Sequence, residues 1–254
     1  GQIAMFNNRI SNFYLAGWNE FFDKLGVINI KGVEVAMQWD IPISKGHHKI
    51  SLQPNFTLLQ TQVLSGELVD RHLFTQIKHT SATKKEFVDK INDHPDGYKV
   101  YVKNVNGNEQ LLTAPISISD LDFITKTVYI FGENGIKDGE TPYAPNLALN
   151  VNLQYSYKNI ALSFGYNRVG EQYAEFANFE NESGDGGLGK INAFSTLDMS
   201  LNYDFKVQNM RCSFFLAGKN IGNQPFVASR LNRGQSGLMP GGFRQVNAGI
   251  NILL

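Results

Sequence analysis

The stretch that decides the fold is residues 146–170, which read NLALNVNLQYSYKNIALSFGYNRVG. From Leu147 to Tyr157, apolar and aromatic residues alternate strictly with small or polar ones. The same alternation runs from Ile160 to Tyr166, after a connection of only a few residues. A period of two is typical of a β-strand with chemically different faces, and a very short connection indicates a hairpin. The stretch therefore predicts two long antiparallel strands.

Similar alternation recurs along the rest of the chain. It covers residues 33–43, 50–58, 197–205, 212–216 and 246–254. Pro42 falls inside the first of these, where proline is tolerated only near a strand end or edge. Counting outward from these segments, we expect eight strands, at about 2–14, 29–43, 49–63, 146–157, 160–170, 195–206, 210–220 and 242–254.

The lengths of the connections distinguish two kinds of sheet. Alternation alone fits a soluble sandwich, with the apolar face in the core, or a membrane barrel, with the apolar face toward lipid. Short connections are expected at 44–48, 158–159 and 206–209, and long ones at 15–29, 64–145, 170–194 and 220–241. Regular alternation of short and long connections is typical of an up-and-down transmembrane barrel. We therefore predict an all-β fold of antiparallel up-and-down strands from such a barrel.

Composition agrees with a sheet-rich, turn-rich protein. Aromatic residues make up 12% and charged residues only 18%, and the formal net charge is zero. Neutrality gives no reason to expect a nucleic-acid partner. Cys212 is the single cysteine, so it is interpreted as a small apolar strand residue. The chain starts with strand-like residues from Ile3, without a recognisable signal peptide, so we expect that it was cut from a longer protein.

Residues 64–135 interrupt the pattern. Phe87, Val88 and Ile91 have helix-like spacing after possible caps at Ser81 or Thr83. Residues 98–103 followed by Asn106-Gly107 predict a hairpin, and residues 123–131 predict a further strand that extends above the membrane. We expect this segment to be one long extracellular loop with its own compact structure.

An ordered set of motifs resembles the TonB-dependent outer-membrane receptors, in particular those of the ferric-citrate type. The matching segments, at similar spacing, are residues 8–10, 29–34, 141–146, 169–173, 178–180, 185–191, 197–198, 218–226, 229–231 and 239–245. The last of them lead into a strand that ends at the C-terminus, as in the family. Leu254 departs from the pattern, because the family usually ends on an aromatic residue.

The resemblance implies a location and a task. Such receptors are Gram-negative outer-membrane barrels of about 22 strands, closed by an N-terminal plug that contacts TonB. They import iron chelates or similar nutrients through loop capture and plug movement. Residues 1–254 would then be the C-terminal part of the barrel. Its partners would be the rest of the barrel, the plug, TonB through that plug, a small-molecule chelate and lipid or lipopolysaccharide.

Nothing in the sequence indicates an enzyme, a cofactor or a metal centre. Motifs for serine hydrolases, zinc proteases, redox thiols and phosphate loops are absent, and the five histidines lack the spacing of a zinc site. Glu34, Gln38, Asp40, Asp198, Asn202 and Asp204 are expected to face the lumen. The resemblance implies ligand contacts by loop arginines and aromatics, and the candidates are Arg168, Tyr173, Phe176, Phe179 and Arg230.

Two other hypotheses remain at this point. One is a soluble or surface β-sandwich that binds glycan or protein, and it predicts short strands and connections in irregular order. The other is a complete eight-stranded structural barrel, which predicts a signal peptide directly upstream and no plug. The residues encoded before Gly1 would distinguish them best.

Overall fold

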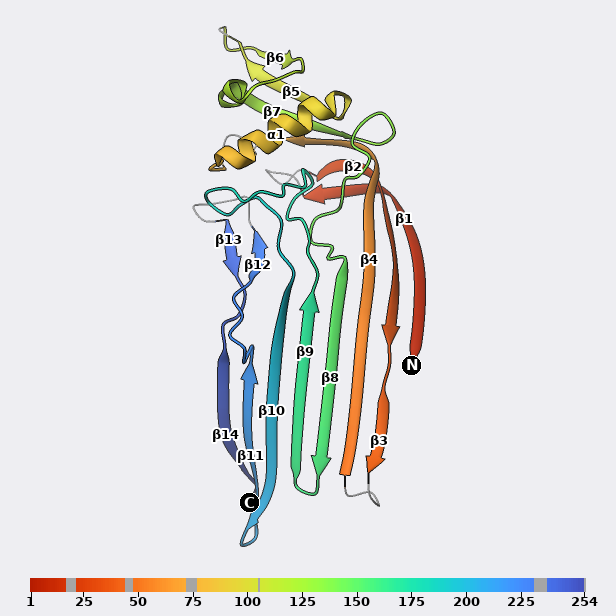
Figure 1. Ribbon diagram of the computed structural model, residues 1–254, viewed down its shortest axis with the longest axis vertical. Helices are drawn as coiled ribbons and strands as arrows, with labels where there is room; N and C mark the ends of the chain where they lie inside the picture. Colours follow the sequence, from red (N-terminus) through yellow and green to blue (C-terminus); the bar gives the residue numbers. More distant parts are fainter. Residues whose placement is uncertain (17–21, 44–47, 72–76, 105, 231–236, 254) are drawn as a thin grey trace.

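The computed structural model describes residues 1–16, 22–43, 48–71, 77–104, 106–230 and 237–253. A tall antiparallel sheet carries a smaller module at one end, which we call the apical end (Figure 1). No helix within the described ranges is both long and apolar enough to span a membrane.

The tall sheet follows the chain from strand to neighbouring strand. Its main path runs β14-β11-β10-β9-β8-β4, and β2 and β3 pair with the other side of β4, with β1 beyond β2. The strands are β1 (Gln2–Ala16), β2 (Phe22–Ala36), β3 (Trp39–Ile43), β4 (His48–Asp70), β8 (Leu147–Tyr157), β9 (Ile160–Val169), β10 (Phe194–Val207), β11 (Met210–Lys219) and β14 (Gln245–Leu253).

Short and long connections lie at opposite ends of this sheet, as the sequence predicts. The β8–β9 and β10–β11 hairpins have two-residue turns at the lower end, closed by the pairs Tyr157↔Ile160 and Val207↔Met210. Lys158 and Gln208 take positive φ there, as tight hairpin turns require. The excursions after β4, β9 and β11 leave from the apical end (Figure 1). The up-and-down arrangement is therefore confirmed.

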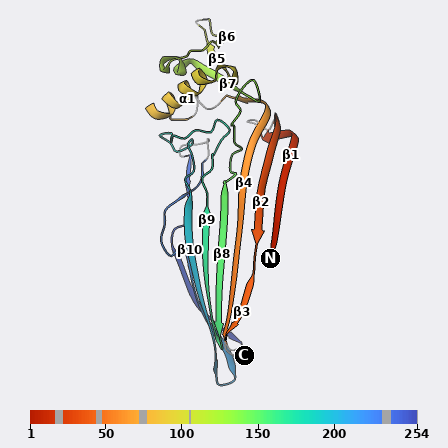
Figure 2. The ribbon, with the colours of Figure 1, turned by 45° about the vertical axis from the view of Figure 1, so that its right-hand side comes forward.

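The register assigns the two kinds of side chain to opposite faces. Val35, Phe56 and Leu149 lie side by side in one row across the sheet. The next row on the same face, two residues further along the strands, contains Val151, Tyr166 and Leu197, so the apolar residues share one face. Asn55, Asn150 and Asn167 lie on the other face, together with Glu34, Asp198, Asn202 and Asp204. The hollows of the sheet, about 800 and 470 Å³, open on this polar face. The curved sheet (Figure 2) is thus concave on its polar side and convex on its apolar side.

The sheet is a single open layer. Strands β1 and β14 form its two margins, and no pairing joins them in the described residues. No second sheet covers the convex apolar face within these residues, which contradicts the sandwich hypothesis. Apolar side chains stay exposed there, for example Met199 at 39% and Ile250 at 59%. A soluble sheet would bury this row against a second layer.

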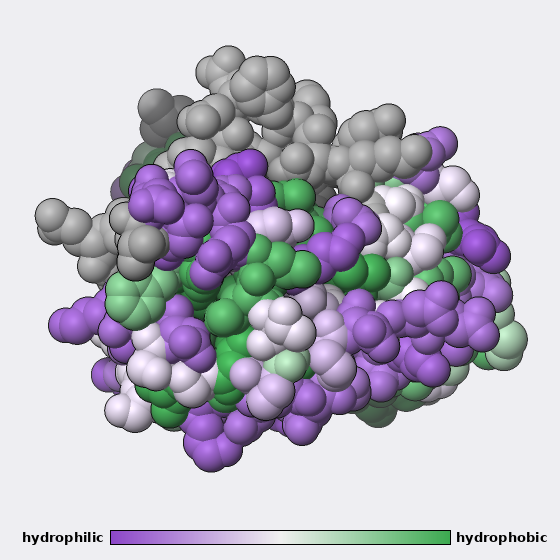
Figure 3. Space-filling model, turned by 90° about the horizontal axis from the view of Figure 1, so that it is seen from above, coloured by the Kyte–Doolittle hydropathy of each residue, from purple (hydrophilic) through white to green (hydrophobic). Residues whose placement is uncertain are grey.

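The apical module contains the main hydrophobic core. It comprises helix α1 (Ser81–Asp93), the 3₁₀ turns Pro95–Gly97 and Ile118–Phe123, and strands β5 (Tyr98–Lys103), β6 (Glu109–Leu112) and β7 (Ile124–Phe131). Strand β7 pairs with the upper part of β4, Gly66–Asp70, so β4 continues from the barrel-like sheet into the module. Phe87, Ile91, Val100 and Tyr129 are buried between helix and sheet. Seen from above, hydrophilic side chains surround the apolar ones (Figure 3).

Several expected boundaries change. Thr80, rather than Ser81 or Thr83, caps α1, and Thr83 completes the capping box. The expected long connection at 15–29 is mostly strand, because β1 continues to Ala16 and β2 starts at Phe22. The connection at 220–241 contains a small hairpin of β12 (Val227–Arg230) and β13 (Leu238–Pro240). The expected turn at 44–48 lies mostly outside the described residues.

Candidate functional site at the apical junction

A cavity of about 810 Å³ lies where the apical module meets the loops of the tall sheet. Its walls come mainly from three segments far apart in sequence, namely helix α1, the 135–140 loop after β7 and the β9–β10 loop at 170–193, with His94 after α1 and Tyr98 at the start of β5 completing them. The lining side chains are mainly charged or aromatic and include Lys85, Glu86, Lys90, His94, Tyr98, Ile136, Lys137, Glu140, Tyr173, Phe176, Asn178 and Glu180. This volume is within the range of small-molecule sites.

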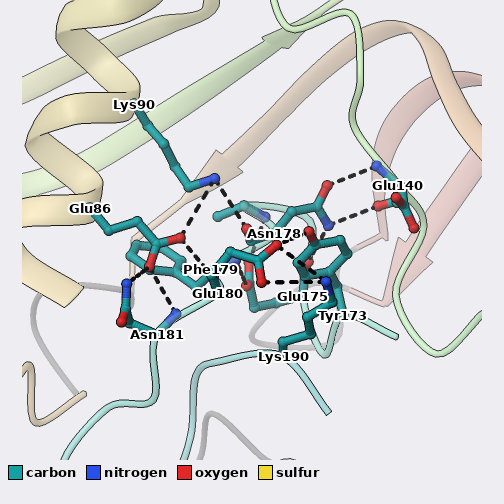
Figure 4. Close-up of polar contacts among 11 residues, drawn as sticks. Glu86, Lys90, Glu140, Tyr173, Glu175, Asn178, Phe179, Glu180, Asn181 and Lys190 are labelled. Atoms are coloured by element: carbon teal, nitrogen blue, oxygen red, sulfur yellow. Dashed lines mark hydrogen bonds and ion pairs between the residues drawn. The ribbon is translucent and has the colours of Figure 1, made fainter. Parts of the chain in front are cut away.

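Helix α1 presents different residues to the core and to the loop. Thr83, Phe87 and Ile91, at helical spacing, are buried. Glu86 and Lys90 form an i,i+4 ion pair at 3.7 Å and contact the β9–β10 loop (Figure 4). The helix therefore serves both as a core element and as a docking surface for this loop.

Glu86 binds the loop through its carboxylate. It accepts the backbone N–H of Glu180 at 2.7 Å and that of Asn181 at 2.9 Å. The Asn181 amide also donates to it at 2.8 Å, and Lys90 donates to the carbonyl of Asn178 at 3.1 Å. Charged partners make these hydrogen bonds stronger than neutral ones. The helix thus fixes residues 178–181 from two points one turn apart.

Phe179 anchors the same segment in the core. Its side chain is fully buried, and its ring stacks on Phe87 with 6.2 Å between ring centroids and 9° between planes. Ala177 and Leu188 of the same loop are also buried in this cluster. Burial of a phenyl ring contributes about 2 kcal/mol from apolar area alone. The loop is therefore integrated into the apical core.

Glu175 shapes the turn that delivers Phe179. Its carboxylate accepts the backbone N–H groups of Ala177 at 2.5 Å and Phe179 at 2.9 Å. Burial raises the pKa of Glu175 to about 7; these two N–H donors and Lys90 oppose the shift, and the Asp70 carboxylate adds to it. The protonation state of this side chain therefore changes near neutral pH.

Asn178 and Lys190 join the remaining parts of the junction. The Asn178 amide accepts the Glu140 N–H at 2.8 Å and donates to the Glu140 carbonyl at 3.1 Å, which ties the 135–140 loop to the β9–β10 loop. Lys190 lies 3.1 Å from Glu171 and 3.4 Å from Glu180, which also accepts the Tyr173 hydroxyl. The cavity rim thus combines an ion-pair network with an aromatic ring.

The five expected ligand residues occupy different environments. Tyr173 and Phe176 line the cavity. Phe179 is buried behind it, and Arg230 is buried against Glu182 at 2.7 Å and the Gly186 carbonyl at 2.9 Å. Arg168 lies on the convex face, in the row of Tyr166, Leu149 and Ser195. The structure therefore brings only Tyr173 and Phe176 together at an open surface.

Other junction residues are absent from the sequence-based candidates. Glu86, Lys90, Glu175 and Asn178 make most of its polar contacts. The i,i+4 spacing of Glu86 and Lys90 in an expected helix is the one signal that could have indicated a pair. In the described ranges, no three His, Cys, Asp or Glu side chains converge as metal ligands.

Comparison with known proteins adds evidence on the fold. No protein-family model and no curated protein matches the sequence. Among solved structures, the ferric-catecholate import receptor Fiu of E. coli K12 has a TM-score of 0.51 and 15% identity over 99% of this chain. The siderophore receptor PiuA of Acinetobacter baumannii has a TM-score of 0.55 and 11% identity, also over 99%.

The match concerns one part of each receptor. The chain spans 25% of the Fiu structure and 26% of the PiuA structure. At this identity the likeness shows the fold alone. The open two-faced sheet with its apical module therefore has the fold of one arc of an outer-membrane receptor barrel.

Proposed function

We propose that this chain is part of a TonB-dependent outer-membrane transporter that imports an iron chelate or a similar nutrient. The observation that carries the proposal is the long single-layer sheet with an apolar convex face and a polar concave face. In lipid, such a sheet meets the acyl chains with one face and lines a lumen with the other. The similarity of fold to Fiu and PiuA supports the same assignment.

The proposal gives each part of the chain a task. Residues 1–254 form the C-terminal part of a barrel in the outer membrane of a Gram-negative bacterium, completed by further strands and a plug that contacts TonB. Residues 64–135 form an extracellular structure, built around α1 and β5–β7. Tyr173 and Phe176 contact the chelate at the apical cavity. The chain has no catalytic task.

Uptake by the intact protein tests this function. The full-length gene that encodes this chain is expressed in a Gram-negative strain lacking its own iron-chelate receptors, and uptake of radiolabelled ferric citrate and ferric catecholate is measured. We expect accumulation of at least one chelate that ends when TonB is deleted. Equal accumulation with and without TonB would contradict the proposal. So would the absence of accumulation for every chelate supplied, provided that the protein is present in the outer membrane.

A second pair of strains tests the proposed contacts. Tyr173→Ala should reduce uptake by weakening capture, with the loss seen mainly at low chelate concentration. Phe123→Ala removes another aromatic ring of the apical module, which is 62% exposed and does not line the cavity, and should leave uptake unchanged. Equal uptake by the two variants would remove Tyr173 from the site.

A further inference from the structure

Arg168 occupies an unexpected position for an arginine. It is exposed and lies on the convex face, at the apical end of a lane of apolar side chains on β9 and β10. That lane consists of Ile160, Leu162, Phe164, Tyr166, Leu197, Met199, Leu201 and Tyr203. A charged side chain on a lipid-facing surface is costly at the bilayer centre and much less so near the interface. Its position at the strand end therefore suggests an interfacial role.

Two hydroxyl groups accompany the guanidinium. Arg168 Nη1 donates to Ser195 Oγ at 3.1 Å, and the Tyr166 hydroxyl lies 3.0 Å from the same oxygen. The pair Arg168↔Ser195 is in direct register, and Tyr166 precedes it on the same face. One arginine and two hydroxyls thus meet at the upper edge of the apolar lane. Arginine presents further N–H donors in a fork that suits phosphate oxygens.

The height of this cluster fits the edge of a bilayer. Ser195 and Phe205 lie about 33 Å apart along β10, which corresponds to about 25 Å along the membrane normal at the tilt usual for barrels. At the lower end of the same face are aromatic rings, with Tyr203 stacked on Phe205 and His48 on Tyr157. Aromatic rows mark the interfaces of transmembrane barrels. If the aromatic rings lie at one membrane surface, the arginine cluster lies at the level of the lipid headgroups of the other surface.

Further positive charge lies on the same face. Arg9 on β1 and Lys31 on β2 are exposed and share the side of Met5, Val33 and Val35. In the part of the chain that the structure describes, no carboxylate pairs with Arg9, Lys31 or Arg168. The convex face therefore carries unpaired positive charge above an apolar surface. An anionic lipid has the complementary arrangement, with phosphate above acyl chains.

We infer that Arg168, Ser195 and Tyr166 bind the phosphate of an anionic glycolipid in the outer leaflet, with its acyl chains along the apolar lane of β9 and β10. This inference rests on the proposed outer-membrane location. It assigns Arg168 to the membrane instead of to the transported chelate. The bound lipid would hold the upper end of this arc at a fixed depth.

Native mass spectrometry of the full-length protein in detergent tests the site. The probe is lipid A with two phosphates, and the compared proteins are the wild type, Arg168→Gln and Arg211→Gln. Arg211 is an exposed arginine on the concave face of β11 and serves as the matched control. We expect Arg168→Gln to lower the lipid-bound fraction about fivefold or more, and Arg211→Gln to leave it unchanged.

Two further ligands distinguish recognition of the phosphate from recognition of the acyl chains. Phosphatidylglycerol should bind more weakly than lipid A, and a glycolipid of the same acyl content without phosphate should bind wild type and Arg168→Gln equally. Equal lipid A binding by all three proteins, or equal binding with and without phosphate, would overturn the inference. Heat-modifiable gel migration of the wild type reports barrel folding separately, so a missing barrel would count against the proposed function and not against this site alone.

Discussion

At the residue scale, Glu175 gives the junction a dependence on pH. Its pKa is about 7 in the folded protein and about 4.5 when exposed. Because the folded-state value is the higher one, the docked loop is most stable when Glu175 is protonated, and stability falls as pH rises from about 4.5 to about 7. The full loss is on the order of 3 kcal/mol. Above pH 7 this contribution should stay constant.

Hydrogen exchange can measure this effect. In the wild type, the amides of Ala177 and Phe179 should lose protection between pH 5 and 7 after correction for intrinsic exchange. Glu175→Gln should flatten that dependence, because its side chain does not ionise. Glu133→Gln, at an exposed position of the same module, is the control. An unchanged pH profile in Glu175→Gln would show that another group is responsible.

Asn220 is a second residue whose side chain organises a loop. Its amide donates to the carbonyls of Gln224 and Gly242 and accepts the Gln224 N–H at 3.0 Å, while its backbone has φ of 45°. Asn220→Ala should therefore destabilise the protein by about 2–4 kcal/mol. Asn220→Gly loses the same bonds without backbone strain, so it should be about 1 kcal/mol less harmful. Thermal unfolding of the full-length protein in detergent measures both.

The role of Asn220 also shows what sequence can and cannot predict at this scale. The segments 197–198 and 218–226 are recognisable separately as motifs. Their contact appears only in the fold, where Asp198 accepts the Asn220 N–H at 2.8 Å. Asp198 was expected to face the lumen, and it lies on that face. The hydrogen bond depends on the β10–β11 register, which local alternation does not specify at the apical end.

At the element scale, the docking of the β9–β10 loop on α1 depends on Phe179. Phe179→Ala removes a fully buried ring that stacks on Phe87, and should destabilise the apical module by about 3–5 kcal/mol. Limited proteolysis should then cut the 170–193 loop much faster than in the wild type. Phe123→Ala truncates a ring that is 62% exposed and should have little effect. Equal cleavage of both variants would show that the ring does not hold the loop.

Elements were predictable where their pattern is local. Helix α1, the β5–β6 hairpin and the strands at 147–169 follow from periodicity and turn residues. The upper part of the β1–β2 hairpin was expected to be a loop, because register shifts near Phe13 interrupt its alternation. Gly26 faces this shift with φ of 124°, and a Cβ atom there would lie 2.3 Å from the Ser65 carbonyl oxygen. Such an irregular strand has no periodic signature.

At the scale of the whole molecule, the junction was hidden from the sequence for a physical reason. Glu86 belongs to α1, Glu140 to the loop after β7 and Tyr173 to the β9–β10 loop, and only the fold brings them to one cavity. The two faces of the tall sheet were predictable, because each strand repeats the same alternation independently. Long-range convergence of loops has no such repetition.

The last prediction concerns the convex and concave faces of the tall sheet. Leu201 and Asn202 are neighbours on β10, but they lie on the convex and concave faces respectively. In a Cys212→Ala background, Asn202→Cys should react with a membrane-impermeant maleimide through a water-filled lumen, while Leu201→Cys should react only with a lipid-soluble reagent. The comparison uses the full-length protein in isolated outer membranes, with its plug unfolded by urea. Because strand, depth and side-chain chemistry are matched, reagent access depends on the face alone. Equal labelling of both positions by the water-soluble reagent would mean that the convex face meets water, and the assignment of this sheet to a membrane barrel would fail.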